Sequence, residues 1–400
     1  MRVLFLTHRL PYAPNRGDRI RAFHIVRALA PRVQLEVVSL VHDEDEAAEA
    51  ERLRALGVGV AVFQTPRLKN YASAVVQLGG TRPLTHILLD APGLTPALAR
   101  LVRERPPDVV LAYCSGMARF ALESPLAGLP LVADLVDVDS QKWAALSTSA
   151  SWPKRWVYRR EASYLESFER RIARHASAML VVNEREREAL RRIAPAANIR
   201  VVPNGVDLGP LARPASIARE PRFVFCGVMN YAPNVDAAVW FSKNVWPAIR
   251  AQRPDARFVV VGSNPTASVQ ALASAGNGIE VTGTVADVRP YLWQSAVAVA
   301  PLLTARGVQN KVLEAIGAGL PAVVTSQVFE GLPAAVRPGC READSAAAFA
   351  RESLSLLELS EKEREAVAAS ADLASLSWEA QLEPLHALLA EATAACGATG

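Results

Sequence analysis

The sequence predicts an α/β protein with two doubly wound domains, each built on a parallel sheet. Its 400 residues exceed what one hydrophobic core normally supports. Short apolar runs alternate with longer amphipathic stretches, which is the pattern of strand–helix units in a parallel sheet. The composition, 50% hydrophobic and 21% charged, is that of folded globular proteins and not of disordered chains. We therefore expect both domains to fold.

The first half of the chain predicts a series of buried strands with helices between them. The opening run 3–6 is too short for a signal peptide and is expected to be a strand. A loop rich in Pro, Asn and Gly follows it, and apolar residues at three-residue steps predict a helix over 20–29. The charged stretch 43–54 is also expected to be helical. Further strands are expected at 35–40, 58–63, 109–113, 131–135, 179–182 and 200–202.

A cluster of Pro, Asn and Gly at 203–210 predicts a domain boundary near the middle of the chain. We expect a first domain over 1–204 and a second over 209–377, with a C-terminal helix over 378–396 that packs back on the first. The second domain repeats the alternation of the first. Its expected strands are 223–226, 258–261, 279–282, 297–300 and 322–325, and its expected helices are 235–252, 268–274, 308–317, 346–359 and 361–370.

The bulk composition limits the possible partners. A net charge of +4 and a pI near 9.0 favour phosphorylated ligands or an anionic membrane surface, and we expect no nucleic acid. The dispersed cysteines and histidines give no ligand spacing for a metal and suit a reducing cytoplasm. No run has the length of a membrane span, so any membrane association is expected to be peripheral.

The most informative stretch is 301–321, which predicts a phosphate-binding site. A strand is expected to end there, a loop containing Gly307 follows, and a helix begins. A helix N-terminus at the carboxyl edge of a parallel sheet offers free N–H groups to a diphosphate. Arg306 and Lys311 add cations, and Glu314, on the same helix face as Lys311, can accept hydrogen bonds from a ribose diol. The alternative is a solvated Lys–Glu pair on an ordinary helix.

A set of short motifs follows in a fixed order along the chain. They are the Gly17 loop, Pro203-Asn204-Gly205-Val206-Asp207, Phe225-Cys226-Gly227, Val260-Val261-Gly262, Gly283-Thr284-Val285, Lys311 to Glu314 and Glu330-Gly331-Leu332. Each is weak alone, but the ordered set resembles the GT-B retaining glycosyltransferases of family 4. Gly17-Asp18-Arg19 and Asp139-Ser140-Gln141-Lys142-Trp143 look especially similar to sugar transferases associated with exosortase and PEP-CTERM exopolysaccharide systems.

The resemblance implies the GT-B fold, in which two Rossmann-like doubly wound domains face a central cleft. It also implies transfer of a sugar from a nucleotide diphosphate sugar, bound to the second domain, to a hydroxyl acceptor that enters from the first. The anomeric configuration would be retained, with no metal or other cofactor. The donor-binding residues expected on this basis are Gly17, Gly227, Asn230, Gly262, Arg306, Gly307, Asn310, Lys311 and Glu314.

The sequence departs from the family pattern at two places. Family members commonly carry two glutamates separated by seven residues; the second matches Glu314, but Arg306 occupies the first position. The loop 227–234 also lacks the Arg and Lys that often hold the diphosphate. We expect Arg306 and Lys311 to replace those cations and to be catalytic, together with Asp137.

Acceptor-side candidates in the first domain lie at the ends of expected strands. The loop around Gly17 has a glycine that lets a ligand approach, although an ordinary turn with exposed charges is the alternative. Asp137-Val138-Asp139 superficially matches a metal-binding DxD motif, but we interpret these aspartates as residues that orient the sugars, with a solvated loop as the alternative. Glu161 and Glu169 are spaced like surface residues. The candidates are Arg16, Asp18, Asp134, Asp139 and Lys142.

The segment from Trp152 to Arg160 mixes aromatic and cationic residues, as membrane-interface segments do. It can contact a lipid-linked acceptor or the inner face of the membrane. The sequence favours the alternative, a helix start near Pro153 with its tryptophans packed inward.

The sequence leaves three classes of function open. The first is a glycosyltransferase that acts on a glycan, lipid-linked or small-molecule hydroxyl acceptor. The second is a sugar-nucleotide epimerase of the same architecture, and the third is a catalytically silent sugar-nucleotide-binding subunit. A nicotinamide dehydrogenase is disfavoured because no GxGxxG follows the first strand.

Overall fold

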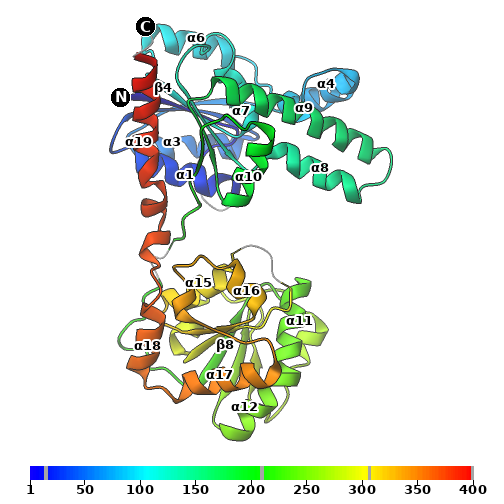
Figure 1. Cartoon of the computed structure of the whole chain (residues 1–400), viewed down its shortest axis with the longest axis vertical. Coiled ribbons are helices and arrows are strands. Elements are labelled where there is room, and N and C mark those ends of the chain that lie inside the picture. Colours follow the sequence, from blue (N-terminus) through cyan, green and yellow to red (C-terminus); the bar gives the residue numbers. More distant parts are fainter. Residues whose placement is uncertain (13–16, 208–210, 305–307, 398–400) are drawn as a thin grey trace. The chain divides into compact units, whose positions relative to one another are not determined.

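The computed structural model describes residues 1–12, 17–207, 211–304 and 308–397 (Figure 1). The chain divides into two compact units. The first comprises Met1–Gly205 and the segment from Trp378 onward, and the second comprises Val206–Ser377. Each unit has one parallel sheet covered by helices, so the predicted pair of doubly wound α/β domains is confirmed.

The first unit contains a seven-stranded sheet in the order β3-β2-β1-β4-β5-β6-β7. Chain order reverses beside β1, where ligands bind in open parallel sheets. Its strands are β1 (Arg2–Thr7), β2 (Gln34–Val41), β3 (Gly59–Gln64), β4 (Val109–Tyr113), β5 (Leu131–Val136), β6 (Ala178–Val181) and β7 (Ile199–Val201). Its helices are α1 (Gly17–Leu29), α2 (Glu44–Ala48), α3 (Ala50–Arg54), α4 (Arg67–Val76), α5 (Leu84–Leu88), α6 (Leu94–Glu104), α7 (Ser115–Ala121), α8 (Asp139–Ser149), α9 (Lys154–His175), α10 (Glu184–Ile193) and α19 (Trp378–Gly397).

The strands of this sheet are almost continuously apolar because both faces are buried. Successive side chains of a strand point to opposite faces. Val3 and Phe5 of β1 therefore enter a core with α1 and α19, whereas Leu4 and Leu6 enter a second core with α6, α7 and α10. Helix α19 completes the first of these cores, and its Trp378 ring stacks on His24 of α1 at 4.4 Å between ring centroids.

The second unit contains a six-stranded sheet in the order β10-β9-β8-β11-β12-β13. Its strands are β8 (Arg222–Cys226), β9 (Arg257–Val261), β10 (Ile279–Val281), β11 (Val297–Ala300), β12 (Ala322–Val324) and β13 (Cys340–Glu342). Its helices are α11 (Ala232–Trp240), α12 (Trp246–Gln252), α13 (Ala267–Gln270), α14 (Arg289–Gln294), α15 (Asn310–Gly317), α16 (Ser326–Gly331), α17 (Ala346–Glu358) and α18 (Glu361–Ala369). Reversal beside β8 again marks the edge where a ligand can approach.

The chain passes between the units twice, and the two passages are adjacent. Val206 forms an isolated parallel bridge with Ser377. One residue earlier, a Cβ on Gly205 would lie 2.3 Å from the Cα of Trp378. Glycine is therefore required at 205, because any side chain would collide with the returning backbone.

Candidate active site

Lys311 lies in the first turn of α15, at the carboxyl edge of the second sheet. Its Nζ donates a hydrogen bond to Oδ1 of Asn234 at 2.6 Å and lies 4.6 Å from the centroid of the Phe225 ring. Burial lowers the pKa of Lys311 to about 8, because desolvation disfavours the charged ammonium group. The group is therefore a buried cation whose nearest hydrogen-bond acceptor is neutral.

Two glycines open the backbone beside this lysine. A Cβ on Gly227, which follows β8, would lie 3.2 Å from the Nζ of Lys311 and 2.7 Å from Nδ2 of Asn234. Gly262, which follows β9, has φ +155°, and a Cβ there would lie 1.6 Å from the carbonyl oxygen of Gly227. The ends of β8 and β9 can approach this closely only because Gly262 lacks a side chain. The backbone of Gly227 is therefore open beside the side chains of Lys311 and Asn234.

Glu314 lies three residues after Lys311 on α15 and is partly buried. Burial raises the pKa of its carboxyl group, and the charge of Lys311 opposes this. The two side chains are close enough to influence each other electrostatically but are not joined by an ion pair in the described part of the chain, where Lys311 binds Asn234 instead. The alternative of a solvated Lys–Glu pair does not fit this arrangement, since the lysine is mostly buried.

The other donor-side candidates are placed only in part. Asn310 is the first residue of α15 and is exposed, as is Asn230 in the loop between β8 and α11. Gly17 is the first residue of α1. Arg306, Gly307 and Arg16 lie outside the described residues, as does the side chain of Asp18.

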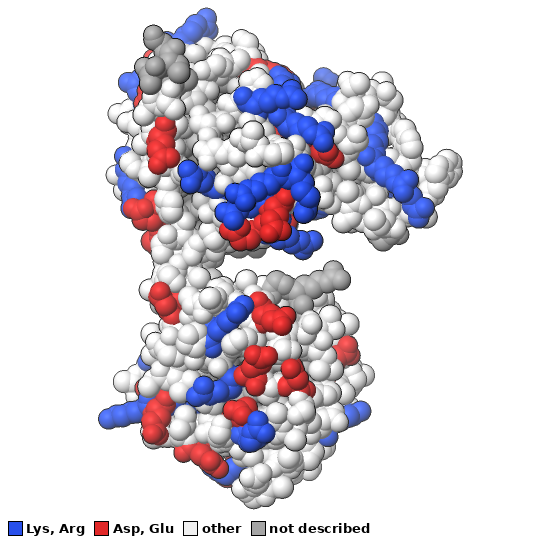
Figure 2. Space-filling model, in the orientation of Figure 1, with Lys and Arg blue, Asp and Glu red and all other residues white. Residues whose placement is uncertain are grey.

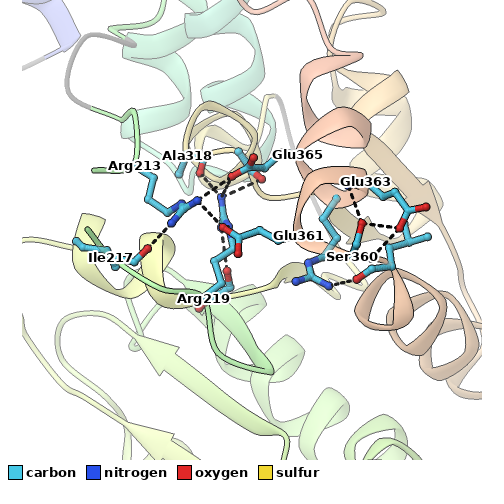
Figure 3. Close-up of polar contacts among 12 residues, drawn as sticks. Arg213, Ile217, Arg219, Ala318, Ser360, Glu361, Glu363 and Glu365 are labelled. Carbon is cyan, nitrogen blue, oxygen red and sulfur yellow. Dashed lines mark hydrogen bonds and ion pairs between the residues drawn. The ribbon is translucent and has the colours of Figure 1, made fainter. Parts of the chain in front are cut away.

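Helix α15 is held from behind by Arg219 (Figure 3). Its guanidinium donates to the carbonyl oxygens of Ala318 at 2.9 Å and Gly319 at 3.2 Å, where α15 ends. It also donates to the carbonyl oxygen of Ser295 at 2.9 Å, just after α14. Glu365 of α18 lies 3.6 Å away and binds the neighbouring Arg213 at 3.0 Å. A cation at a helix C-terminus satisfies its free carbonyls and stabilises its dipole. Arg219 therefore fixes the position of the helix that carries Lys311.

In the first unit, Asp134 is buried and is not available to an acceptor. Its side chain is 0% exposed and forms an ion pair with Nε of Arg21 at 2.9 Å. Arg21 also donates to the carbonyl oxygen of Pro203 at 3.1 Å and to Oδ1 of Asn204 at 3.0 Å. Asp134 thus joins β5 to α1 and to the segment before the second unit, so its assignment as an acceptor-side residue was wrong.

Two carboxylates near the end of β5 lie in hydrogen-bonded, desolvated environments. Asp139 accepts a hydrogen bond from the hydroxyl of Ser115 at 2.7 Å, and burial raises its pKa. Glu169 of α9 is fully buried and accepts from the backbone N–H of Ser140 at 3.0 Å and from its hydroxyl at 2.5 Å. Burial raises the pKa of Glu169 to about 7. These contacts anchor the start of α8.

The other polar candidates of this edge are exposed. Asp137 lies between β5 and α8 with its side chain in solvent, and Lys142 lies on the exposed face of α8. Both are therefore accessible to a substrate. Asp139 is partly exposed but is engaged by Ser115, so it is better placed to position this edge than to react.

Strained backbone gathers at the carboxyl edges of both sheets. The non-glycine residues with positive φ in the described chain are Cys114 at 71°, Val136 at 65° and Asn264 at 52°. They follow or end β4, β5 and β9, respectively. Such conformations cost about 1–3 kcal/mol and persist where the surrounding structure enforces them, often at functional sites. Sequence reasoning missed these positions, since a valine gives no signal for positive φ.

Two expectations about surface exposure were wrong. Trp152 is 83% and Trp156 is 50% exposed, so these tryptophans do not pack inward. Glu161 and Glu169, spaced like surface residues, are buried instead. Glu161 accepts hydrogen bonds from the backbone N–H groups of Leu84 at 2.8 Å and Thr85 at 2.9 Å.

The described residues contain no group of three or more His, Cys, Asp or Glu side chains placed to hold a metal ion. None of their helices has the length and apolar character needed to cross a membrane.

Comparisons with known proteins place both halves of the chain. Residues 16–205 match the family model described as a glycosyl transferase 4-like domain, and residues 220–359 match the one described as glycosyl transferases group 1. Together these matches span most of the chain. No curated protein sequence matches it significantly.

Solved structures share the whole fold at low identity. HepE of Anabaena, solved with UDP and also with UDP-glucose, is 16% identical with a TM-score of 0.59 in its UDP complex, over 98% of this chain and 100% of that one. TarM of S. aureus, solved with UDP and α-GlcNAc-glycerol, is 10% identical with a TM-score of 0.55, over 97% and 99%. A trehalose-6-phosphate synthase studied for glycosyl transfer with retention is 13% identical with a TM-score of 0.56, over 98% and 99%.

Fold and family together define this protein as a GT-B glycosyltransferase. More particularly, it joins a glycosyltransferase 4-like first domain to a group 1 second domain.

Proposed function

We propose that this glycosyltransferase transfers a sugar from a nucleotide diphosphate sugar to a hydroxyl acceptor, with retention of configuration and without a metal. One observation carries the proposal: the pair of Lys311 and Asn234 beside the open backbone of Gly227 and Gly262, with Glu314 one turn away. The UDP and UDP-glucose complexes of HepE, which has the same fold, support the choice of donor.

Lys311 is proposed to bind the donor diphosphate. A buried ammonium group with only a neutral acceptor gains strongly from an anionic partner. The N–H groups of the first turn of α15, which begins at Asn310, are proposed to bind the same oxygens. Gly307 and Arg306 are proposed to contribute a close backbone approach and a second cation. These groups stabilise the negative charge that develops on the departing diphosphate.

Glu314 is proposed to bind the ribose. A carboxylate accepts hydrogen bonds from both hydroxyls of a vicinal diol. No described residue donates to Glu314, so its lone pairs are open to such a ligand. Gly227, Asn230, Gly262 and Gly17 are proposed to contact the rest of the donor, since glycine lets a ligand approach the backbone.

The reaction itself is proposed to proceed on one face of the sugar. The bond between the anomeric carbon and the phosphate oxygen breaks while the acceptor oxygen bonds to that carbon on the same face. The acceptor proton passes to the departing phosphate oxygen. Asp137 is the proposed catalytic carboxylate of the first domain, since it is exposed. Arg16, Asp18, Asp139 and Lys142 are proposed to orient the acceptor.

The same proposal extends to the acceptor, the compartment and a membrane contact. Acceptors with hydroxyl groups include glycans, small molecules and lipid-linked sugars. We place the reaction in the cytoplasm, in the synthesis of exopolysaccharide or another cell-surface glycan such as those of exosortase systems. Peripheral membrane contact is proposed at Trp152–Arg160, supported by the exposure of Trp152 and Trp156.

A thermal-shift panel of UDP-, GDP- and ADP-sugars tests the proposal, because a ligand of the native state raises the melting temperature. We expect one base to stabilise the protein. Glu314→Gln should weaken binding of that donor about tenfold, the loss of roughly one charged hydrogen bond. The matched control Glu358→Gln, at an exposed position of α17, should leave affinity unchanged.

Products then separate the remaining classes of function. Transfer with the anomeric configuration of the donor, seen by NMR, supports the proposal. Conversion of the donor to its epimer without an acceptor indicates the epimerase instead. Donor binding without turnover across soluble and lipid acceptors indicates a silent binding subunit.

A further inference from the structure

Helix α4 carries its apolar side chains on the solvent side. Leu68, Tyr71, Val75 and Val76 are 88%, 54%, 72% and 84% exposed. The first three are spaced i, i+3 and i+7 and form one stripe along the helix. An amphipathic helix of a globular domain normally turns such a stripe toward the core.

The opposite face of α4 is the one that packs on the domain. Asn70 and Ala74 are buried there, and Nδ2 of Asn70 donates to the carbonyl oxygens of Leu88 at 3.1 Å and Asp90 at 2.8 Å. Polar contacts thus hold the helix while its apolar face remains free. These contacts fix the orientation of α4, so its apolar stripe faces solvent although the helix is packed on the domain.

The segment that follows α4 is tied to the beginning of α9. Nη2 of Arg160 donates to the carbonyl oxygens of Gln77 at 3.2 Å, Gly80 at 2.6 Å and Arg82 at 3.1 Å. The first part of α9, which carries the exposed Trp156 and follows the exposed Trp152, is therefore anchored to the segment after α4. Both apolar groups belong to the same region of the first domain (Figure 1).

The charged residues within both chain segments have one sign. The sequence has no Asp or Glu between Glu51 and Asp90, and none from Ser140 to Arg160. Arg67 and Lys69 flank the stripe of α4, and Lys154 and Arg155 lie beside the tryptophans; all four are exposed. The projecting end of α8 and α9 shows blue basic and white uncharged atoms (Figure 2).

We propose that α4 and the α8–α9 turn together form a docking surface for an anionic lipid bilayer. An apolar helix face edged by cations lies in a membrane interface with its apolar side chains among the acyl chains and its cations at the headgroups. Tryptophan is enriched at the same depth. The inference extends the contact proposed at Trp152–Arg160 to α4, which becomes its principal element.

A second copy of this chain is the competing occupant, and the charges disfavour it. In a two-fold symmetric dimer the same surface meets itself. The cations of one copy would then face those of the other with no carboxylate of this surface between them. An anionic bilayer instead supplies the missing negative charge.

Vesicle sedimentation of the full chain, without donor or acceptor, tests the surface. We expect binding to vesicles of phosphatidylcholine with phosphatidylglycerol, and little binding to phosphatidylcholine alone. Leu68→Gln with Val75→Gln, and separately Lys154→Gln with Arg155→Gln, should each weaken binding about tenfold. The controls are Leu56→Gln, an exposed leucine of the same domain, and Arg191→Gln with Arg192→Gln on the exposed face of α10.

Each outcome decides between the occupants. Failure of the wild-type chain to bind anionic vesicles overturns the proposal, and equal binding by α4 variants and controls removes α4 from the surface. A wild-type dimer that the α4 variants convert to monomers shows that a second copy covers the face instead. Circular dichroism verifies that each variant is folded. Turnover with a soluble acceptor is measured separately, so loss of the proposed transferase function leaves this test intact.

Discussion

The Nζ of Lys311 and the Oδ1 of Asn234 lie 2.6 Å apart, and no described carboxylate forms an ion pair with this lysine. A donor diphosphate would therefore be its first anionic partner. The pKa of about 8 means that the proposed phosphate cation is charged at neutral pH and is lost in mildly alkaline solution.

Donor affinity should consequently fall above pH 8. Anion binding favours the charged lysine, so the complex takes up a proton when the free protein has lost it. We expect the Kd for the donor nucleotide to rise about tenfold between pH 7 and pH 9. Calorimetry in buffers of different ionisation enthalpy measures both the affinity and the proton uptake.

Lys311→Met should bind weakly at every pH, and Lys362→Met, exposed on α18, should keep the wild-type profile. In the absence of donor, the lowered pKa of Lys311 makes the stability of the protein depend on pH in the direction opposite to donor affinity. Between about pH 8 and 10.5 the folded state binds fewer protons at Lys311 than the unfolded state, so its contribution to the free energy of unfolding rises with pH. Equal affinity at pH 7 and 9 would exclude Lys311 as the phosphate cation.

Asp134→Asn should act on stability and not specifically on acceptor binding. It leaves Arg21 buried without its counterion, which costs about 3–5 kcal/mol of the free energy of unfolding. Urea denaturation measures this, with Asp137→Asn, at an exposed position, as the stability control. A stable Asp134→Asn enzyme with only a raised KM for acceptor would contradict the structural role.

Glu169→Gln should change the pH dependence of stability. The pKa of Glu169 is raised from 4.5 to about 7, so the folded state binds more protons than the unfolded state in that interval. The contribution of Glu169 to the free energy of unfolding therefore falls, by up to about 3 kcal/mol, as the pH rises from 4.5 to 7. Relative to wild type, the variant should gain that amount between pH 4.5 and pH 7.5.

Glu188→Gln, on the exposed side of α10, serves as the control for this measurement and should follow the wild-type curve. Parallel curves for wild type and Glu169→Gln would show that the carboxyl group is ionised throughout the interval.

Arg219→Lys should loosen the donor helix. Lysine lacks the planar fork that reaches the carbonyls of Ser295, Ala318 and Gly319, so we expect a loss of about 2 kcal/mol in the free energy of unfolding. The urea midpoint and the donor Kd are the two readouts. Arg341→Lys, at an exposed position of β13, should alter neither. An unchanged urea midpoint for Arg219→Lys would show that Arg219 does not hold α15 in place.

Strands were the most predictable part of the fold. Runs such as 3–6 and 258–261 are buried on both sheet faces and are therefore continuously apolar. A few consecutive residues are enough to recognise such a strand. β13 was missed because only Cys340 of its three residues is both apolar and buried. Helix α4 was missed too; moreover, the usual rule for an apolar stripe would have placed its exposed face inward.

The polar contacts of the site were less predictable because their partners are distant in sequence. From the sequence, Asp134 resembles an accessible carboxylate at the end of a strand. Its partner Arg21 is 113 residues away in the chain, so only the folded structure shows that they form an ion pair. The hydrogen bonds of Glu161 with Leu84 and Thr85, and of Lys311 with Asn234, were missed for the same reason. Local spacing correctly directed attention to Lys311 and Glu314, but only the assembled sheet edge shows which side chains remain available.

The adjacent passages at Gly205–Val206 and Ser377–Trp378 also order the assembly of the protein on the ribosome. The second unit is one uninterrupted stretch of chain and can close as soon as it has emerged. The first begins to emerge earlier, yet the core that α1 and α19 form on one face of its sheet stays incomplete until α19 is made. The domain whose synthesis begins first is thus completed after the second, and the apolar side chains that α19 covers stay unpartnered during that interval.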